Sequence, residues 1–235
     1  MKRKNVPFQV ATNILLLSIL GILAAFCLPN NTSTAVFAPY YSGEENSGRV
    51  GIMINVYEGA EQVEKIIEIL DKTETTCTFF VGGVWAEKNI PLLKKMALCA
   101  EIGNHGYLHR DHAKISKQAN KEEIVLCHKL VKTVAGIDMT LFAPPSGSYS
   151  DDTLSVCEEN GYKVVMWSKD TIDWRDHDKD LIFKRATTDV KGGDLILMHP
   201  TEETVKALPK IIAFYKSQGL IPSVVSDVIG VKSYY

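Results

Sequence analysis

From Arg49 onward, the sequence alternates between short apolar segments typical of strands and longer segments with helical periodicity. The expected strands are 50–56, 76–81, 139–143, 163–167, 194–199 and 223–228. The expected helices are 60–71, 87–101, 121–135, 152–160, 179–190 and 204–218. Strands that alternate with helices are normally parallel and buried on both faces, so we expect an α/β fold. Periodicity alone does not distinguish a barrel from an open doubly wound sheet.

The charge balance of the chain argues against nucleic-acid binding. Among 235 residues, 26 Lys and Arg face 28 Asp and Glu, which gives a formal net charge of -2 at pH 7. No excess of positive charge is therefore left to bind a phosphate backbone. The apolar fraction of 46% and the charged fraction of 23% are typical of a globular protein rather than a disordered or coiled-coil chain. We expect one domain with an appendage, and a monomer.

The N-terminal segment, residues 1–29, combines a basic start at residues 2–4 with an apolar run within residues 10–28. That run approaches the roughly 17 to 20 residues that cross a bilayer. It is interpreted either as an uncleaved signal anchor or as a signal peptide cleaved after Ala38. We prefer the anchor, because Pro39 follows that site and the site lies far from the apolar run. In both cases the remainder is exported, which predicts a single-pass cell-membrane protein with its C-terminal domain outside the cytoplasm, or a secreted protein.

Residues 30–48 are rich in Asn, Ser, Thr, Gly and Glu and show no periodicity. This composition predicts a flexible tether between the N-terminal segment and a domain that spans residues 49–235.

The cysteines of the expected domain do not form a metal-binding pattern. They are far apart in the sequence, with no C-x-x-C pair, so zinc-finger spacing is absent. Each lies among apolar neighbours, which predicts small buried side chains rather than ligands. These residues are Cys77, Cys99, Cys127 and Cys157.

Polar residues that can bind a metal or take part in catalysis follow several of the expected strands. The carboxyl ends of parallel strands meet at one edge of an α/β fold, where such proteins build their sites. We therefore expect three carboxylates of this kind and three imidazoles to gather on one rim. They are Glu58, His105, His109, Asp170, Asp173 and His199.

His105 and His109 are four residues apart, so one helical turn would place both imidazoles on the same face. With Glu58 they make a set of two histidines and one carboxylate that leaves room for water, which suits catalytic zinc or a related divalent ion. Two surface histidines are the commoner explanation of an H-x-x-x-H pattern. The metal hypothesis gains weight because the pair follows Gly103-Asn104 in an expected turn.

The region from about Arg49 to Gly230 resembles the polysaccharide deacetylase family, the NodB-homology or carbohydrate esterase family 4. The stretches that carry the resemblance are 78–88, 101–105, Asp173-Trp174 and Leu197-Met198-His199. Its membrane-anchored, sporulation-associated bacterial branch is the most similar. The resemblance implies a distorted (β/α) barrel with fewer than eight strands. It also implies removal of acetyl groups from chitin-like or peptidoglycan glycans with a divalent metal.

Two family motifs depart from their usual residues. The T-F-D-D-G motif falls on residues 55–59. Glu58 replaces the Asp that binds the metal in the family, and Tyr57 replaces the Asp that acts as general base. The R-P-P-Y-G motif falls on residues 143–147, where Ala143 replaces the Arg that holds the base in the family. The base and its holder are therefore replaced together.

The remaining functional positions of the family are retained. The resemblance assigns metal binding to His105 and His109, and general-acid catalysis to His199. Asp173 would orient His199, and such a partner raises the pKa of an imidazole and fixes its tautomer. Ser146 replaces a family Tyr whose backbone N–H contributes to the oxyanion hole, and a backbone donor survives that change. The expected substrate contacts are Trp174, Leu197 and Pro145.

Two functions fit these departures. The first is a metal-dependent deacetylase of a cell-wall or spore glycan, in which Tyr57 or Glu58 substitutes for the base. Bound zinc lowers the pKa of its water to about 7, although a positioned base is worth roughly 10² to 10⁴ in rate. The second is a membrane-tethered pseudoenzyme that binds glycan or a partner through the same groove. A purely structural membrane protein conflicts with the retained histidines and Asp173.

Overall fold

The computed structural model describes residues 13, 17–18 and 37–231. The chain divides into two units, Met1–Val36 and Phe37–Tyr235. The predicted signal segment at residues 1–29 lies almost entirely outside the described residues, as does the tether up to residue 36. Within the described ranges, no helix is both long enough and apolar enough to cross a membrane.

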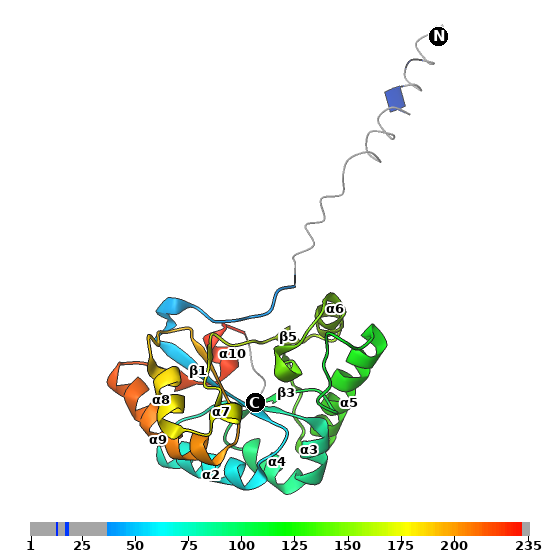
Figure 1. Ribbon diagram of the computed structural model, residues 1–235. Helices are drawn as coiled ribbons and strands as arrows, with labels where there is room; N and C mark the ends of the chain where they lie inside the picture. Colours follow the sequence, from blue (N-terminus) through cyan, green and yellow to red (C-terminus); the bar gives the residue numbers. More distant parts are fainter. Residues whose placement is uncertain (1–12, 14–16, 19–36, 232–235) are drawn as a thin grey trace, which may run out of the picture. The chain divides into compact units, whose positions relative to one another are not determined.

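The second unit is built on parallel strands that curl into a half-barrel (Figure 1). Seven strands follow the order β5-β4-β3-β2-β1-β7-β6, and β8 pairs with β1 off this path. This arrangement confirms the predicted distorted barrel. The strands are β1 Arg49–Val56, β2 Thr78–Val81, β3 Glu101–Asn104, β4 Leu141–Phe142, β5 Lys163–Val164, β6 Lys169–Asp170, β7 Leu195–Met198 and β8 Ile221–Ser223.

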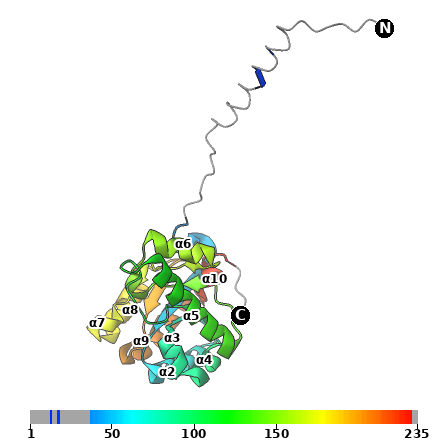
Figure 2. The same cartoon turned by 90° about the vertical axis from the view of Figure 1, so that its right-hand side faces the viewer.

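Helices connect the strands and surround the sheet (Figures 1 and 2). The longest, α5, begins after Ser116, whose hydroxyl accepts the Ala119 N–H, and ends before Gly136 at φ 75°. The described helices are α2 Ala60–Lys72, α3 Gly83–Lys88, α4 Ile90–Met96, α5 Lys117–Ala135, α6 Asp151–Glu159, α7 Asp173–Asp176, α8 Lys179–Thr187, α9 Glu202–Ser217 and α10 Val225–Val228. Short 3-10 turns are η1 Glu45–Ser47 and η2 Pro145–Gly147.

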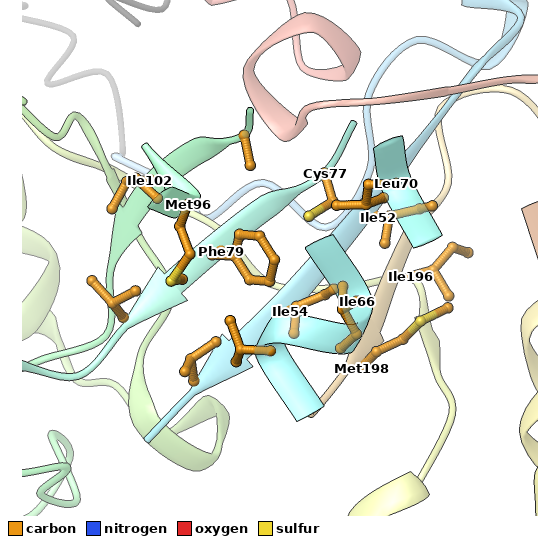
Figure 3. Close-up of a cluster of buried hydrophobic side chains, with 14 of the residues drawn as sticks. Ile52, Ile54, Ile66, Leu70, Cys77, Phe79, Met96, Ile102, Ile196 and Met198 are labelled. Carbon is orange, nitrogen blue, oxygen red and sulfur yellow. The ribbon is translucent and has the colours of Figure 1, made fainter. Parts of the chain in front are cut away.

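Alternate residues of β1 serve the two faces of the sheet. Ile52 and Ile54 belong to the apolar layer between sheet and helices, where Figure 3 shows Ile54 near Ile66 and Ile52 near Leu70, both of α2. Met53 belongs to a second apolar cluster on the other face, and Asn55 lines a cavity. The period of two along an extended strand therefore separates residues of the core from residues that reach the candidate site.

Part of the predicted tether packs against the domain. Tyr40 forms a β-bridge with Val165, and Ser42 forms one with Asp194. The packed unit thus begins before the predicted boundary at residue 49.

Three of the domain cysteines are buried, as predicted, but Cys99 is exposed. The predicted helix 87–101 is broken at Asn89 into α3 and α4, and α4 ends at Met96. Cys99 therefore lies in the turn that leads to β3 rather than on the inner face of a helix, which corrects the prediction for this residue.

Candidate functional site

A cavity of about 240 Å³ opens where several strands end. Parallel strands bring their carboxyl ends to one edge, so residues distant in sequence meet there. Its walls come from β1, β6, β7, α7, the 3-10 turn after β4 and the loops after β1, β3, β5 and β7. The lining residues are Asn55, Tyr57, His105, His109, Ser146, Trp167, Asp170, Trp174, Leu197 and His199.

Most of the residues predicted from the sequence meet at this cavity. Asp173 lies directly behind His199, to which it is hydrogen-bonded. Glu58 is exposed and Pro145 is buried, and neither lines the cavity. The predicted residues that do line it are Tyr57, His105, His109, Ser146, Asp170, Trp174, Leu197 and His199.

His105 is held as a neutral imidazole with one defined tautomer. Its Nδ1 lies 2.7 Å from the carbonyl oxygen of Ala143, so Nδ1 donates and Nε2 keeps its lone pair. Burial, followed by the neighbouring His109, lowers the pKa of His105 to about 3. Burial also lowers the pKa of His109, whose backbone adopts a left-handed conformation at φ 57°.

Tyr57 occupies the space between the histidines. Its ring centroid lies 4.2 Å from that of His109, and 6.4 Å from those of His105 and His199. Burial, followed by the charges of Glu58 and Asp173, raises the pKa of the phenol above its ordinary value of 10.0. A phenol with a raised pKa stays protonated at neutral pH, which argues against the predicted role of Tyr57 as a substitute base.

Among the described residues, the predicted metal ligands do not form a ready-made site. Within the part of the chain that the structure describes, no group of three or more His, Cys, Asp or Glu is arranged to hold a metal ion. The His105 and His109 rings are close, with centroids 5.1 Å apart, but Glu58 follows β1 in an exposed turn. A divalent ion needs more ligands than two imidazoles. The set of Glu58, His105 and His109 therefore stays a prediction, and the charge of Glu58 acts on His109.

His199 and Asp173 form an ordered pair on the opposite wall. His199 Nδ1 lies 2.8 Å from Asp173 Oδ1, and the His199 backbone N–H donates to Asp173 Oδ2 at 2.6 Å. Thr204 Oγ1 donates to the same Oδ2 at 2.6 Å, and Asp173 is fully buried. Because Nδ1 faces the carboxylate, Nε2 is the nitrogen left for a ligand. Ile172, just before the pair, has a left-handed φ of 54°, a conformation that a β-branched residue adopts only when its surroundings enforce it.

Two lining residues, Trp167 and Asn55, were not predicted from the sequence, and a third, Asp170, was predicted at this rim without a specific role. Trp167 and Asp170 are half-buried, and Asp170 Oδ1 accepts the Ile172 N–H at 2.8 Å. Asn55 is 2% exposed, and its Oδ1 has no hydrogen-bond partner among the described residues. Positions at or near strand ends are the signal that could have identified Trp167 and Asn55, since the same signal identified Asp170, Asp173 and His199.

Comparisons with known proteins agree with this fold. The family model for polysaccharide deacetylase matches residues 44–165. A peptidoglycan-N-acetylglucosamine deacetylase of Bacillus cereus is 30% identical over 189 residues, which cover 78% of this chain and 69% of the relative. YlxY, an uncharacterized protein of Bacillus subtilis strain 168, is 34% identical over 192 residues. Those residues cover 81% of this chain but only 60% of YlxY.

Among solved structures, a carbohydrate esterase family 4 pseudoenzyme of Bacillus anthracis, BA3943, superimposes with a TM-score of 0.80 at 31% identity. The match covers 82% of this chain and 69% of that one. A mutant of BA3943 with restored enzymatic activity matches with the same TM-score at 30% identity, over 82% of this chain and 71% of the mutant. Together with the family model and the deacetylase relative, these matches show that this chain belongs to the polysaccharide deacetylase family.

Proposed function

We propose that the protein binds a cell-wall amino-sugar glycan, of the peptidoglycan or chitin type, and hydrolyses its acetamide bonds very slowly or not at all. The observation that carries the proposal is the position of Tyr57. Its protonated ring is stacked on His109, where the family resemblance places a carboxylate base. Family membership supports a glycan as the ligand, and the similarity to BA3943 supports impaired catalysis.

Acetamide hydrolysis requires an activated water. A positioned general base typically contributes roughly 10² to 10⁴ in rate. At this cavity a phenol stands in the place of that base, and the buried Ala143 offers no charge to hold one. Glu58, the other candidate for a substitute base, is exposed and does not line the cavity.

The cavity retains features that bind a sugar. Trp167, Trp174 and Leu197 present apolar surface to the cavity, and Trp174 is 52% exposed. Aromatic faces pack well against the C–H face of a pyranose ring, and a few polar groups then fix its orientation. His199 and Asn55 supply such polar groups within the same walls.

We also propose that the N-terminal segment holds this domain at the outer surface of the cell membrane, where a cell-wall glycan is accessible. The basic residues 2–4 and the apolar run within residues 10–28 support this location.

A slow deacetylase is the second candidate, and the His199–Asp173 pair favours it. The hydrogen bonds that orient His199 are complete, so a proton donor for a leaving amine remains in place. The acid side of the reaction alone would support only a small fraction of the family's usual rate.

The two candidates are separated by measuring glycan binding and acetate release on the same preparation. Chito-oligomers and peptidoglycan are titrated calorimetrically, and acetate is then assayed with and without added zinc. We expect binding without acetate release above the blank. A slow release that His199→Ala abolishes would favour the second candidate, whereas absence of binding to every glycan would overturn the proposal.

A further inference from the structure

We propose that the sugar seated in the cavity is a glucosamine residue with a free 2-amino group, whose ammonium is received by Asp170. This inference rests on the proposed glycan binding and specifies the chemical class of the ligand. The ligand class is therefore a partly or fully de-N-acetylated amino-sugar chain, rather than the acetylated chain on which deacetylases act.

The charges of the cavity wall favour a cation. Asp170 is the only carboxylate among the lining residues, and neither Lys nor Arg is among them. One oxygen of Asp170 accepts the Ile172 N–H, and the charge of Arg175 acts on Asp170, but no ion pair within 4.0 Å joins Asp170 to a described side chain. The neighbouring Asp173 is different, because three hydrogen bonds from the protein already occupy its oxygens. An ammonium at Asp170 would gain a charge-assisted hydrogen bond.

Asn55 provides an independent sign of a missing hydrogen-bond donor. It lines the cavity and is 2% exposed, and its Oδ1 has no partner among the described residues. Buried amide oxygens are almost always hydrogen-bonded, and an unpaired one in the cavity wall is compatible with a ligand that brings an N–H or O–H group. A protonated amine supplies several donors at once, while an acetylated nitrogen supplies one.

The Tyr57 ring leaves less room for an acetyl group. It lies between His109 and His199, at centroid distances of 4.2 Å and 6.4 Å. The family resemblance places the acetyl group against Trp174 and Leu197, which line the same cavity. An amine without the acetyl carbons and oxygen avoids the ring.

The aromatic side chains are compatible with the same ligand. Tyr57, Trp167 and Trp174 all line the cavity, and the electron-rich faces of such rings attract an ammonium group. They also offer flat surfaces on which a pyranose ring can pack. Sugar binding and selection for a positive charge therefore arise from the same wall.

The test is a calorimetric titration of the full chain with three oligosaccharides of equal length: oligomers of glucosamine, of N-acetylglucosamine and of glucose. We expect the glucosamine oligomer to bind at least about tenfold more tightly than the acetylated one, as for a hydrogen bond to a charged group. Asp170→Asn retains an oxygen for the Ile172 N–H and is expected to remove this preference. Asp170→Ser, which retains a hydroxyl for the same bond, is the second variant.

Asp152→Asn is the matched control, because Asp152 is exposed in the first turn of α6 and does not line the cavity. It should leave the preference unchanged. An equal loss in Asp152→Asn and Asp170→Asn would show general attraction of a cationic polymer and overturn the inference. Equal or tighter binding of the acetylated oligomer would also overturn it while leaving glycan binding intact. Absence of binding to all three oligomers would overturn the proposed function itself.

Discussion

The phenol ring of Tyr57 is stacked on the imidazole of His109, with centroids 4.2 Å apart and planes inclined by 36°. Tyr57 stands at the motif position where the family resemblance places the general base. The same ring lies 6.4 Å from His199, edge to face, so it also separates the two histidine-bearing walls. Tyr57, the residue that directly follows β1, thus makes this cavity different from the site that the family motifs imply.

Replacing Asp173 by Asn is expected to destabilise the fold and loosen His199. The fully buried carboxylate accepts three hydrogen bonds, and an amide nitrogen would face one of those donors without being able to accept from it. Leaving a buried group unsatisfied costs about 1 to 3 kcal/mol in the free energy of unfolding. Urea unfolding measures the change, and Asp152→Asn should stay within about 0.5 kcal/mol of the wild type. An equal effect of both substitutions would contradict the role given to Asp173.

The stability of the domain should fall in acid because of the buried histidines. Burial lowers the pKa of His105 from 6.5 to about 3, so the unfolded state binds more protons than the folded state between these values. The free energy of unfolding therefore rises with pH across that window. The contribution of His105 to it is lost as the pH falls from 6.5 toward 3. His109 and His112, whose pKa values are also lowered, act in the same direction.

This pH dependence is measured by urea unfolding at several pH values for the wild type and for His105→Gln. Each excess proton changes the slope by up to about 1.4 kcal/mol per pH unit. We expect a shallower slope in the variant. An unchanged slope would show that His105 is not the group that resists protonation.

Glu123 is expected to hold the loop after β3, which carries both His105 and His109. Its side chain is 4% exposed, and Oε2 accepts the backbone N–H groups of Tyr107 and Leu108 at 2.9 and 2.7 Å. Glu123→Ala should cost about 1 to 3 kcal/mol and accelerate amide exchange at these two residues. Glu122→Gln, on the exposed face of the same helix, is the control. Unchanged exchange at Tyr107 and Leu108 would contradict this role.

The sequence predicted the α/β class well because apolar periodicity reports burial directly. It missed β3, whose residues Glu101, Gly103 and Asn104 do not have the composition of a strand. The structure explains this exception: the buried Glu101 carboxylate accepts hydrogen bonds from Thr78 Oγ1 and the Ser226 N–H. The hydrogen bonds that stabilise this buried carboxylate come from residues distant in the sequence, so periodicity cannot reveal them.

The sequence predicted which residues belong to the candidate site more accurately than how their side chains are arranged. Strand ends and family motifs identified the histidines that line the cavity, because both signals depend on chain position. The exposure of Glu58 and the stacking of Tyr57 on His109 depend on how the turn after β1 directs each side chain. Neither is encoded in spacing, and both decide whether a metal ligand and a base are present.

The most direct test of impaired catalysis compares acetate release from chito-oligomers by the wild type and by the double variant Tyr57→Asp and Ala143→Arg. The variant restores a carboxylate and a cation at the positions where the family motifs place them. We expect release by the wild type at the blank level and by the variant at least about tenfold above it, within the range of a general base. Because Ala143 is fully buried, a lower melting temperature is also expected. Acetate release by the wild type equal to or greater than that of a folded double variant would contradict the account.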